Sequence, residues 1–217
     1  EENKNPYCLI VGGGQGGIAL AARLRQLNVP TIVIDKNQNP GDSWRDRYHS
    51  LCLHDTVWYD HMPYLPFPDH WPIFSPKDKI GDWLEMYTKI MEINYWGSTE
   101  CLNASYDQKK QTWEVIADRE GQEIKLTPRH LILATGMSGM PQFPDIKNID
   151  KFKGDYCHSS GFKNGLEYRG KNAVVVGSNN SAHDIAAELW EQGAANVTMI
   201  QRSATTVAKS KTLTELS

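Results

Sequence analysis

The sequence predicts an α/β fold built from two parallel strand–turn–helix–strand units, and three observations lead to this prediction. Residues 7–35 run from an apolar stretch through a glycine-rich turn and an Ala/Leu-rich stretch into a second apolar strand. Residues 171–202 repeat this order. Between them, residues 99–127 alternate apolar and polar side chains between turn-forming clusters, which indicates a small inserted antiparallel β-meander.

The turn of the first unit carries a phosphate-binding pattern. Gly12, Gly14 and Gly17 fit G-x-G-x-x-G between a buried strand and a helix. The first glycine permits the tight turn, the second lets a pyrophosphate approach the backbone, and the third lets the helix pack on the strand. Asp35 ends the next strand about 20 residues on, where a carboxylate hydrogen-bonds a ribose hydroxyl. A flexible surface turn is the alternative for the glycines alone, and Asp35 favours a dinucleotide site.

The second unit departs from this pattern at two places. Asn179 stands at the middle glycine of the turn at residues 177–182, and we expect it there because Asn tolerates positive φ. Its larger side chain would keep a pyrophosphate farther out. The second strand ends in Arg202 and Ser203 rather than in an acid. A carboxylate repels a 2′-phosphate and an arginine pairs with it, so the first unit should take FAD and the second NADPH. A solvated surface arginine is the alternative for Arg202, and Lys209 is a further candidate for the phosphate.

Two such units predict a FAD/NAD(P)-binding three-layer fold of two Rossmann-like units that passes electrons between a nicotinamide and a flavin. We expect a FAD-binding domain at residues 1–150, a linker at residues 151–170, and the start of an NADPH-binding domain at residues 171–217. Because a doubly wound sheet needs further strands, we expect the C-terminal part of the fold to be missing from this chain.

The segments between the two units predict a helix, a strand and a loop that packs onto the domain. Residues 75–91 predict a helix capped by Ser75, with one apolar face that Gly81 weakens by about 1 kcal/mol relative to Ala. Residues 130–134 predict a parallel strand covered on both faces. The Pro- and aromatic-rich residues 63–72 should pack onto the domain rather than serve as a ligand for a proline-reading module.

Composition narrows the function classes. The chain has 23 Lys and Arg against 26 Asp and Glu, a net charge of −3, which gives no electrostatic footprint for nucleic acid. No apolar run approaches the ~20 residues of a membrane span. Four scattered cysteines without a C-x-x-C pair predict reduced thiols in a cytoplasmic protein. The spacing of the loop histidines and acids matches no metal motif, so no metal is expected. These residues are His49, His54, Asp55, Asp60 and His61.

Residues 152–162 read F-x-G-x-x-x-H-x-x-x-F, which resembles the identifying motif of flavin-containing monooxygenases and their plant auxin-forming relatives. The Gly-Asp-Ser-Trp-Arg stretch at residues 41–45 and Ala-Thr-Gly at residues 134–136 are similar to further elements of that family, in the same order. Baeyer–Villiger members usually carry Trp where this chain has Phe162.

The resemblance implies a class B flavin-dependent monooxygenase that uses FAD, NADPH and O2. Reduction by NADPH, reaction with O2 to a 4a-(hydro)peroxyflavin and transfer of one oxygen atom to a small organic substrate are the implied steps, with N,N-dimethylaniline monooxygenase activity as one example. A pyridine nucleotide–disulfide-type reductase and a non-catalytic nucleotide-binding protein remain alternative functions. For the assembly of the chain, a homodimer is one candidate. The absence of C-x-x-C argues against the reductase.

The resemblance also implies the site residues. His54 occupies the place where mammalian-type members carry Asn beside the flavin, and it is a candidate catalytic residue because imidazole titrates near neutral pH. A structural loop histidine is the alternative, and His158 is expected to couple the two domains. The implied FAD contacts are Gly12, Gly14, Gln15, Gly16, Gly17, Asp35, Lys36, Ser43, Trp44, Arg45, His54, Asp55, Thr135 and Gly136. The implied NADPH contacts are Gly177, Asn179, Ser181, Ala182, Arg202 and Ser203.

Overall fold

The structure is a computed structural model that describes residues 5–137 and 139–216, and it divides into two compact units. The first unit contains the residues up to Asp46 together with Asp60–Trp71 and Asp78–Gly139. The second contains Arg47–Tyr59, Pro72–Lys77 and the residues from Met140 on. Two early segments of the chain therefore pack with the second unit.

A four-stranded parallel sheet forms the centre of the first unit, in the order β3-β2-β1-β7. Leu9 of β1 lies opposite Ile32 of β2 and Leu131 of β7, so the predicted strands pair directly. The strand bounds are β1 Cys8–Val11, β2 Thr31–Ile34, β3 Tyr95–Trp96 and β7 His130–Leu133.

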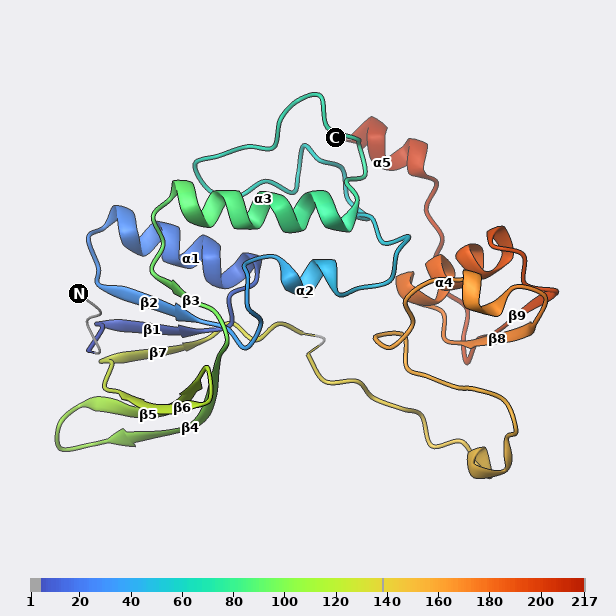
Figure 1. The fold of residues 1–217 in the computed structure, drawn as a ribbon. Helices are drawn as coiled ribbons and strands as arrows, with labels where there is room; N and C mark the ends of the chain where they lie inside the picture. Colours follow the sequence, from blue (N-terminus) through green and yellow to red (C-terminus); the bar gives the residue numbers. More distant parts are fainter. Residues whose placement is uncertain (1–4, 138, 217) are drawn as a thin grey trace. The chain divides into compact units, whose positions relative to one another are not determined.

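Alternation along the strands sends side chains to opposite faces of this sheet, and each face is covered differently (Figure 1). Helix α1 (Gln15–Gln26) packs Ala21 against Ile10 and Val33 on one face. The antiparallel meander packs Val115 and Leu126 against the other face. Its strands are β4 Thr99–Asp107, β5 Thr112–Arg119 and β6 Gln122–Leu126. The result is the predicted three-layer arrangement, with the meander as the third layer.

Strand β7 is an edge strand among the described residues. Leu131 and Ile132 pack on opposite faces, as predicted, but Leu133 is 70% exposed. Side chains are therefore covered on both faces only in the middle of the strand, because β7 pairs with β1 alone among the described residues.

Helix α3 (Lys77–Ile90) begins later than the predicted cap. The Ser75 hydroxyl donates to the carbonyl of Pro72 at 3.2 Å, and Pro76 forms a β-bridge with Cys52. The backbone at this point is paired with residues 51–53, since Leu53 N–H donates to Ser75 O at 2.8 Å. This tertiary pairing accompanies a helix that begins at Lys77, one residue after the predicted first helical position.

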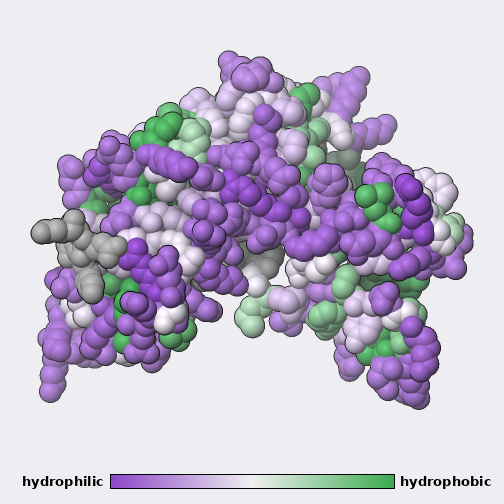
Figure 2. Space-filling view, in the orientation of Figure 1, coloured by the Kyte–Doolittle hydropathy of each residue, from purple (hydrophilic) through white to green (hydrophobic). Residues whose placement is uncertain are grey.

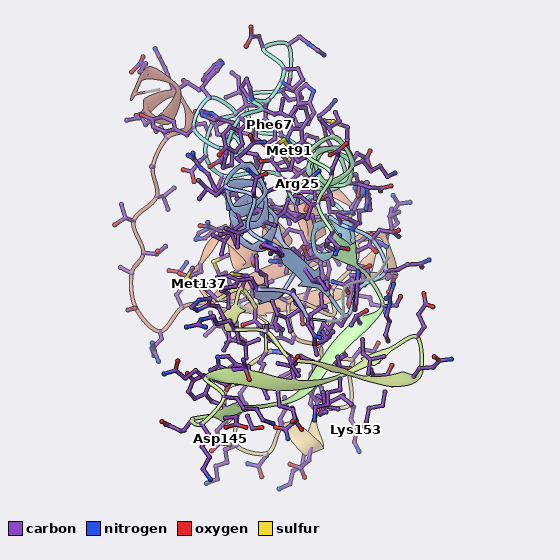
Figure 3. All side chains as sticks on the ribbon, turned by 90° about the vertical axis from the view of Figure 1, so that its left-hand side faces the viewer. Arg25, Phe67, Met91, Met137, Asp145 and Lys153 are labelled. Atoms are coloured by element: carbon purple, nitrogen blue, oxygen red, sulfur yellow. The ribbon has the colours of Figure 1, made fainter. Side chains whose placement is uncertain are left out.

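The Pro- and aromatic-rich segment packs onto α3, as predicted. Phe67, labelled in Figure 3, stacks on Trp71 with ring centroids 5.0 Å apart and meets Trp83 of α3 edge-on at 5.2 Å. The Tyr87 hydroxyl of the same helix donates to Pro63 O at 2.8 Å.

The second unit contains the repeated strand–turn–helix–strand pattern. Strands β8 (Asn172–Val176) and β9 (Asn196–Ile200) pair in parallel, and helix α4 (Asn180–Glu191) buries Ile185 and Leu189. Trp190 of the same helix is 67% exposed. Shorter helices complete the described chain. These are α2 Asp42–Arg45 in the first unit, and η1 Ile149–Lys151, η2 Leu166–Tyr168 and α5 Ser210–Leu216 in the second.

On the face drawn in Figure 2, hydrophobic residues form small separate areas among hydrophilic ones. Across the described ranges, every helix is too short or too polar to cross a membrane.

Candidate dinucleotide-binding sites

The three glycines of the first turn meet different surroundings. Gly12 has φ +109°, and a Cβ there would lie 2.3 Å from Ala134 O of the neighbouring β7 chain. A Cβ on Gly17 would lie 2.0 Å from Gly12 O, so the start of α1 can approach the turn only with glycine. A Cβ on Gly14 would meet no described atom within 4 Å. The space at Gly14 is therefore free for a ligand, which is the role expected of the second glycine.

Asp35 is held beside this turn at the end of β2. Its Oδ2 accepts from Gly13 N–H at 2.6 Å, and its Oδ1 accepts from Asn37 N–H at 2.8 Å. Each carboxylate oxygen has a second lone pair, so the group can still accept from a ribose hydroxyl. Burial raises the pKa of the nearby Tyr95 phenol, and the negative charge of Asp35 raises it further. Lys36 is exposed.

Helix α2 brings the predicted Ser43–Arg45 stretch to the first turn. Trp44 Nε1 donates to Gln15 Oε1 at 3.2 Å, which joins α2 to the first residue of α1. Thr135 and Gly136 follow β7 and are exposed, with Gly136 at φ +79°. Because the carboxyl ends of parallel strands share one edge, the turn, Asp35 and Thr135 come together there.

Arg45 is engaged by carboxylates of its own unit. Its Nη1 donates to Asp42 Oδ1, and its Nη2 donates to Asp82 Oδ1 and Glu85 Oε2, each at 2.9 Å. A hydrogen bond from Lys89 lowers the pKa of Glu85, and the charges of Lys89 and Arg45 lower it further. The guanidinium therefore fixes α2 on α3.

The close approach of α2 and α3 explains Gly81. A Cβ on Gly41, which has φ +89°, would lie 2.2 Å from Gly81 O, and a Cβ on Gly81 would lie 2.9 Å from Arg45 Cγ. The helix accepts the propensity cost of glycine because a side chain has no room there. Sequence reasoning missed the acids of α3 that bind Arg45, since their partner lies 37 or 40 positions away.

In the second turn, Gly177 has φ +142°, whereas Asn179 has φ −89° and ψ 178°. The expectation that Asn179 serves a positive φ is wrong. Gly14 is similarly extended, at φ −75° and ψ −176°, so this position needs no left-handed backbone in either unit.

His54 lies against α4 in the second unit, together with other residues of the segment Arg47–Tyr59. Its Nδ1 is 2.8 Å from Asn180 Nδ2, and its Nε2 is 3.0 Å from Asp184 Oδ2. Asp55 is exposed. Both residues therefore lie in the second unit and not in the unit with the first turn, with which the predicted flavin contacts grouped them.

Arg202 and Ser203 follow β9 and are exposed. Within residues 5–137 and 139–216, the Arg202 guanidinium has no hydrogen-bond or ion-pair partner, so it is available to a ligand. In the linker motif, Phe162 is buried and stacks on Tyr168 with ring centroids 5.7 Å apart. His158 Nδ1 is 2.9 Å from Ser160 Oγ, which gives this histidine a local role in the loop.

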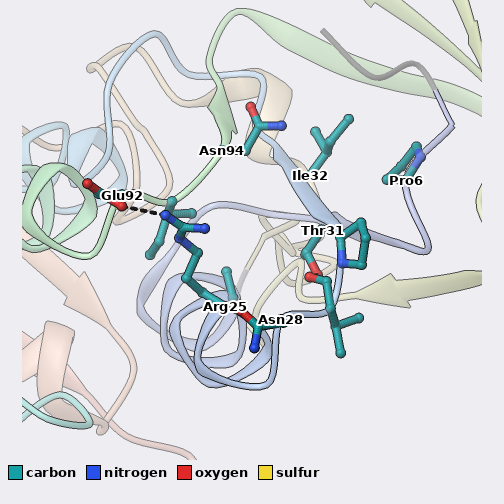
Figure 4. A pocket seen from close by; sticks show the side chains of 11 residues that line it. Pro6, Arg25, Asn28, Thr31, Ile32, Glu92 and Asn94 are labelled. Carbon is teal, nitrogen blue, oxygen red and sulfur yellow. Dashed lines mark hydrogen bonds and ion pairs between the residues drawn. The ribbon is translucent and has the colours of Figure 1, made fainter. Parts of the chain in front are cut away.

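A pocket of about 300 Å³ lies at the other end of the first sheet (Figure 4). Arg25 and Asn28 from the end of α1 line it with Thr31 from the start of β2, and Arg25 pairs there with Glu92. Since Asp35 lies past the opposite end of β2, this pocket is separate from the glycine turn. Across the described ranges, no cluster of three or more His, Cys, Asp or Glu could hold a metal.

Comparison with known proteins gives a consistent result. The model of the flavin-binding monooxygenase-like family matches residues 37–212. An indole-3-pyruvate monooxygenase of Oryza sativa subsp. japonica, YUCCA1, is 33% identical over 190 residues, which cover 87% of this chain and 46% of that protein. The chain thus spans about half the length of the curated relatives it matches.

Two solved structures share the fold. A flavin-containing monooxygenase from Stenotrophomonas maltophilia has a TM-score of 0.86 at 22% identity, covering 95% of this chain and 61% of that one. A structure of OTEMO in complex with FAD and NADP has a TM-score of 0.74 at 26% identity, covering 91% of this chain and 39% of that one. Because the family model matches more than half of the chain, the chain belongs to the flavin-binding monooxygenase-like family.

Proposed function

We propose that the protein containing this chain is a flavin-dependent monooxygenase that uses FAD, NADPH and O2 to oxygenate a small organic substrate. The pair of glycine turns carries the proposal, because the strand after the first turn ends in Asp35 and the strand after the second ends before Arg202. Family membership supports it, and so does a related structure that holds both FAD and NADP.

We assign FAD to the first turn. The open space at Gly14 and the carboxylate of Asp35 fit a pyrophosphate and an unphosphorylated ribose. Trp44 and Ser43 lie where α2 meets the start of α1, and they would border the same ligand. Arg45 contributes through the position of α2, because three carboxylates already occupy its guanidinium.

We assign NADPH to the second turn. Gly177 shapes that turn, and Asn179, Ser181 and Ala182 lie at the start of α4. The free guanidinium of Arg202 suits a 2′-phosphate, with Ser203 beside it. Bound FAD would supply the redox chemistry by accepting hydride from NADPH and passing electrons to O2, while the protein orients both cofactors and limits the access of water.

The first experiment uses the full-length protein with FAD. We expect NADPH to bleach the flavin absorbance without oxygen, and admission of O2 to restore it with oxygenated product formed. Indole-3-pyruvate is the first substrate to test, since the rice relative carries its name. Turnover of a disulfide without O2 consumption would instead identify the reductase. The four cysteines are scattered without a C-x-x-C pair, which favours the monooxygenase over the reductase, and we propose a cytoplasmic location.

Arg202→Ala tests the cofactor assignment. Loss of a charge-assisted phosphate contact, worth about 1.5–3 kcal/mol, should weaken NADPH binding at least tenfold. NADH serves as the internal control because it lacks the 2′-phosphate, and equal losses for both nucleotides would remove Arg202 from the phosphate site.

A further inference from the structure

A chain of polar side chains joins the segment Arg47–Tyr59 to one face of α4. Asn180, Asp184 and Glu188 follow each other at four-residue spacing, so they lie on the same face of the helix. His54 bonds the first two of these residues, and the Tyr48 hydroxyl donates to Asp184 Oδ2 at 2.8 Å.

The third residue of this face anchors the same segment. Glu188 is 3% exposed, and its Oε2 accepts from the hydroxyl and the N–H of Ser50. Its Oε1 accepts from Gly165 N–H at 2.9 Å. A buried carboxylate needs such partners, so Ser50 is fixed on the helix two turns after Asn180.

Both ring nitrogens of the His54 imidazole have a hydrogen-bond partner. With the Asn180 amide nitrogen as donor, Nδ1 accepts, and the proton on Nε2 is donated to Asp184. Neither ring nitrogen is left for a metal or a reacting proton in this arrangement. Tyr48 is 1% exposed, and burial raises the pKa of its phenol to about 12, so the hydroxyl stays a donor.

This network of polar side chains contacts the first turn of α4, which follows the second glycine turn. Asn180 is the first residue of the helix, next to Asn179 and Ser181 of the predicted pyrophosphate contacts. Asp184 begins the next turn, where a negative charge competes with a bound pyrophosphate for the positive end of the helix. Two donors on Oδ2 hold this carboxylate against segment Arg47–Tyr59.

We propose that His54 and Tyr48 are positioning residues of the second dinucleotide site: through Asn180 and Asp184 they fix the first turn of α4 and so set the affinity for NADPH. This inference rests on the proposed function, because it takes the second turn as the NADPH site. It assigns His54 to the nicotinamide cofactor and not to flavin chemistry.

The test measures flavin reduction in the full-length FAD-loaded protein over a range of NADPH concentrations, which separates the NADPH Kd from the limiting reduction rate. Loss of two hydrogen bonds should raise the NADPH Kd at least about tenfold in His54→Ala. We expect the limiting rate and the FAD content to stay within twofold of the wild type. His54→Gln, which keeps a donor and an acceptor, should recover part of the affinity.

Tyr48→Phe is a second variant for the same measurement, in case His54→Ala does not fold. It removes a single hydroxyl, and we expect about a threefold rise in the NADPH Kd. His49→Ala is the matched control, because this exposed neighbour lies outside the network and should bind NADPH like the wild type. Unchanged affinity in both His54→Ala and Tyr48→Phe overturns the inference, as does a lost limiting rate at constant Kd, which would make His54 catalytic. A wild-type protein that holds FAD but does not bind NADPH overturns the proposed function as well.

Discussion

At the residue scale, the glycines of the first turn have different structural roles. Gly17 is required by the fold, since its Cβ would lie 2.0 Å from Gly12 O. Gly14 is required by nothing that the structure describes, since a Cβ there meets open space. A motif that looks uniform in sequence therefore combines a position required for packing with a position that is open to a ligand.

Alanine at these two positions should separate stability from binding. Gly17→Ala should destabilise the apoprotein by about 1–3 kcal/mol because the start of α1 must move. Gly14→Ala should leave the urea midpoint of the apoprotein nearly unchanged and weaken FAD binding at least tenfold. Urea denaturation and flavin titration measure the two effects. Loss of stability in Gly14→Ala with normal flavin affinity would contradict the assignment.

Tyr48 should make the protein sensitive to alkali. The pKa of its phenol is raised from 10.0 to about 12 in the folded state, mainly by burial. Since the folded state holds the proton longer, this contribution is complete below pH 10 and is lost as the pH rises from 10 to 12. The free energy of unfolding should therefore fall there, by up to about 1.4 kcal/mol per pH unit from this group.

Tyr48→Phe supplies the comparison for this prediction. Urea denaturation of both proteins between pH 9 and 12 should show a smaller fall in the variant. The buried Tyr95, whose pKa is also raised, is present in both proteins and cancels in the difference. Identical pH curves would show that the Tyr48 hydroxyl is not buried as described.

At the scale of elements, α2 has four residues and depends on its neighbour for stability. Arg45 ties it to Asp82 and Glu85 of α3, and Gly41 and Gly81 let the two backbones meet. Trp44, which we propose as a flavin contact, is thereby placed beside Gln15. Within this stretch, Arg45 positions the helix, and Trp44 stays a proposed contact of the cofactor.

Arg45→Met should therefore weaken flavin binding indirectly. Three carboxylates lose their common cation, and we expect a loss of about 1–3 kcal/mol in unfolding free energy with a lower flavin affinity. Lys89→Met is the matched control, since it removes an exposed partner of Glu85 and should cost under about 1 kcal/mol. Weakened flavin binding at unchanged apoprotein stability would instead place Arg45 on the ligand.

At the scale of the whole molecule, the chain passes between its two units several times. Arg47–Tyr59 and Pro72–Lys77 belong with the unit that starts at Met140. Hydrogen bonds carry this association, such as His49 N–H to Lys163 O at 2.8 Å. Met137, labelled in Figure 3, and Met140 are exposed near the last passage between the units.

Cleavage at this passage should leave the two fragments associated. A protease site inserted after Gly139 in the 217-residue chain would separate two fragments covalently, yet the second unit would still contain residues from both. We expect co-elution in size-exclusion chromatography and separation in urea. The double variant Ser50→Ala and Tyr48→Phe should weaken the association of the two fragments. Separation of the wild-type fragments without denaturant would contradict this division of the chain.

Much of the fold could be predicted because it depends on local patterns. Apolar runs, alternation and glycine turns predict β1, α1, β2, the meander and the β8–α4–β9 repeat, and the structure contains them. These patterns arise from contacts within one element or with its immediate neighbour in sequence. The start of α3 differed from prediction because Leu53 and Lys77 pair the backbone across a loop.

The sequence by itself determined the family, the order of the two turns and the opposite charges that follow them, because each lies in a short contiguous motif. Only the tertiary structure decided what His54 and Arg45 touch. His54 meets Asn180 and Asp184 at separations of 126 and 130 residues, and Arg45 meets Glu85 at a separation of 40. Such polar contacts have no period and leave no local pattern, so they become visible only when the folded chain brings their partners together.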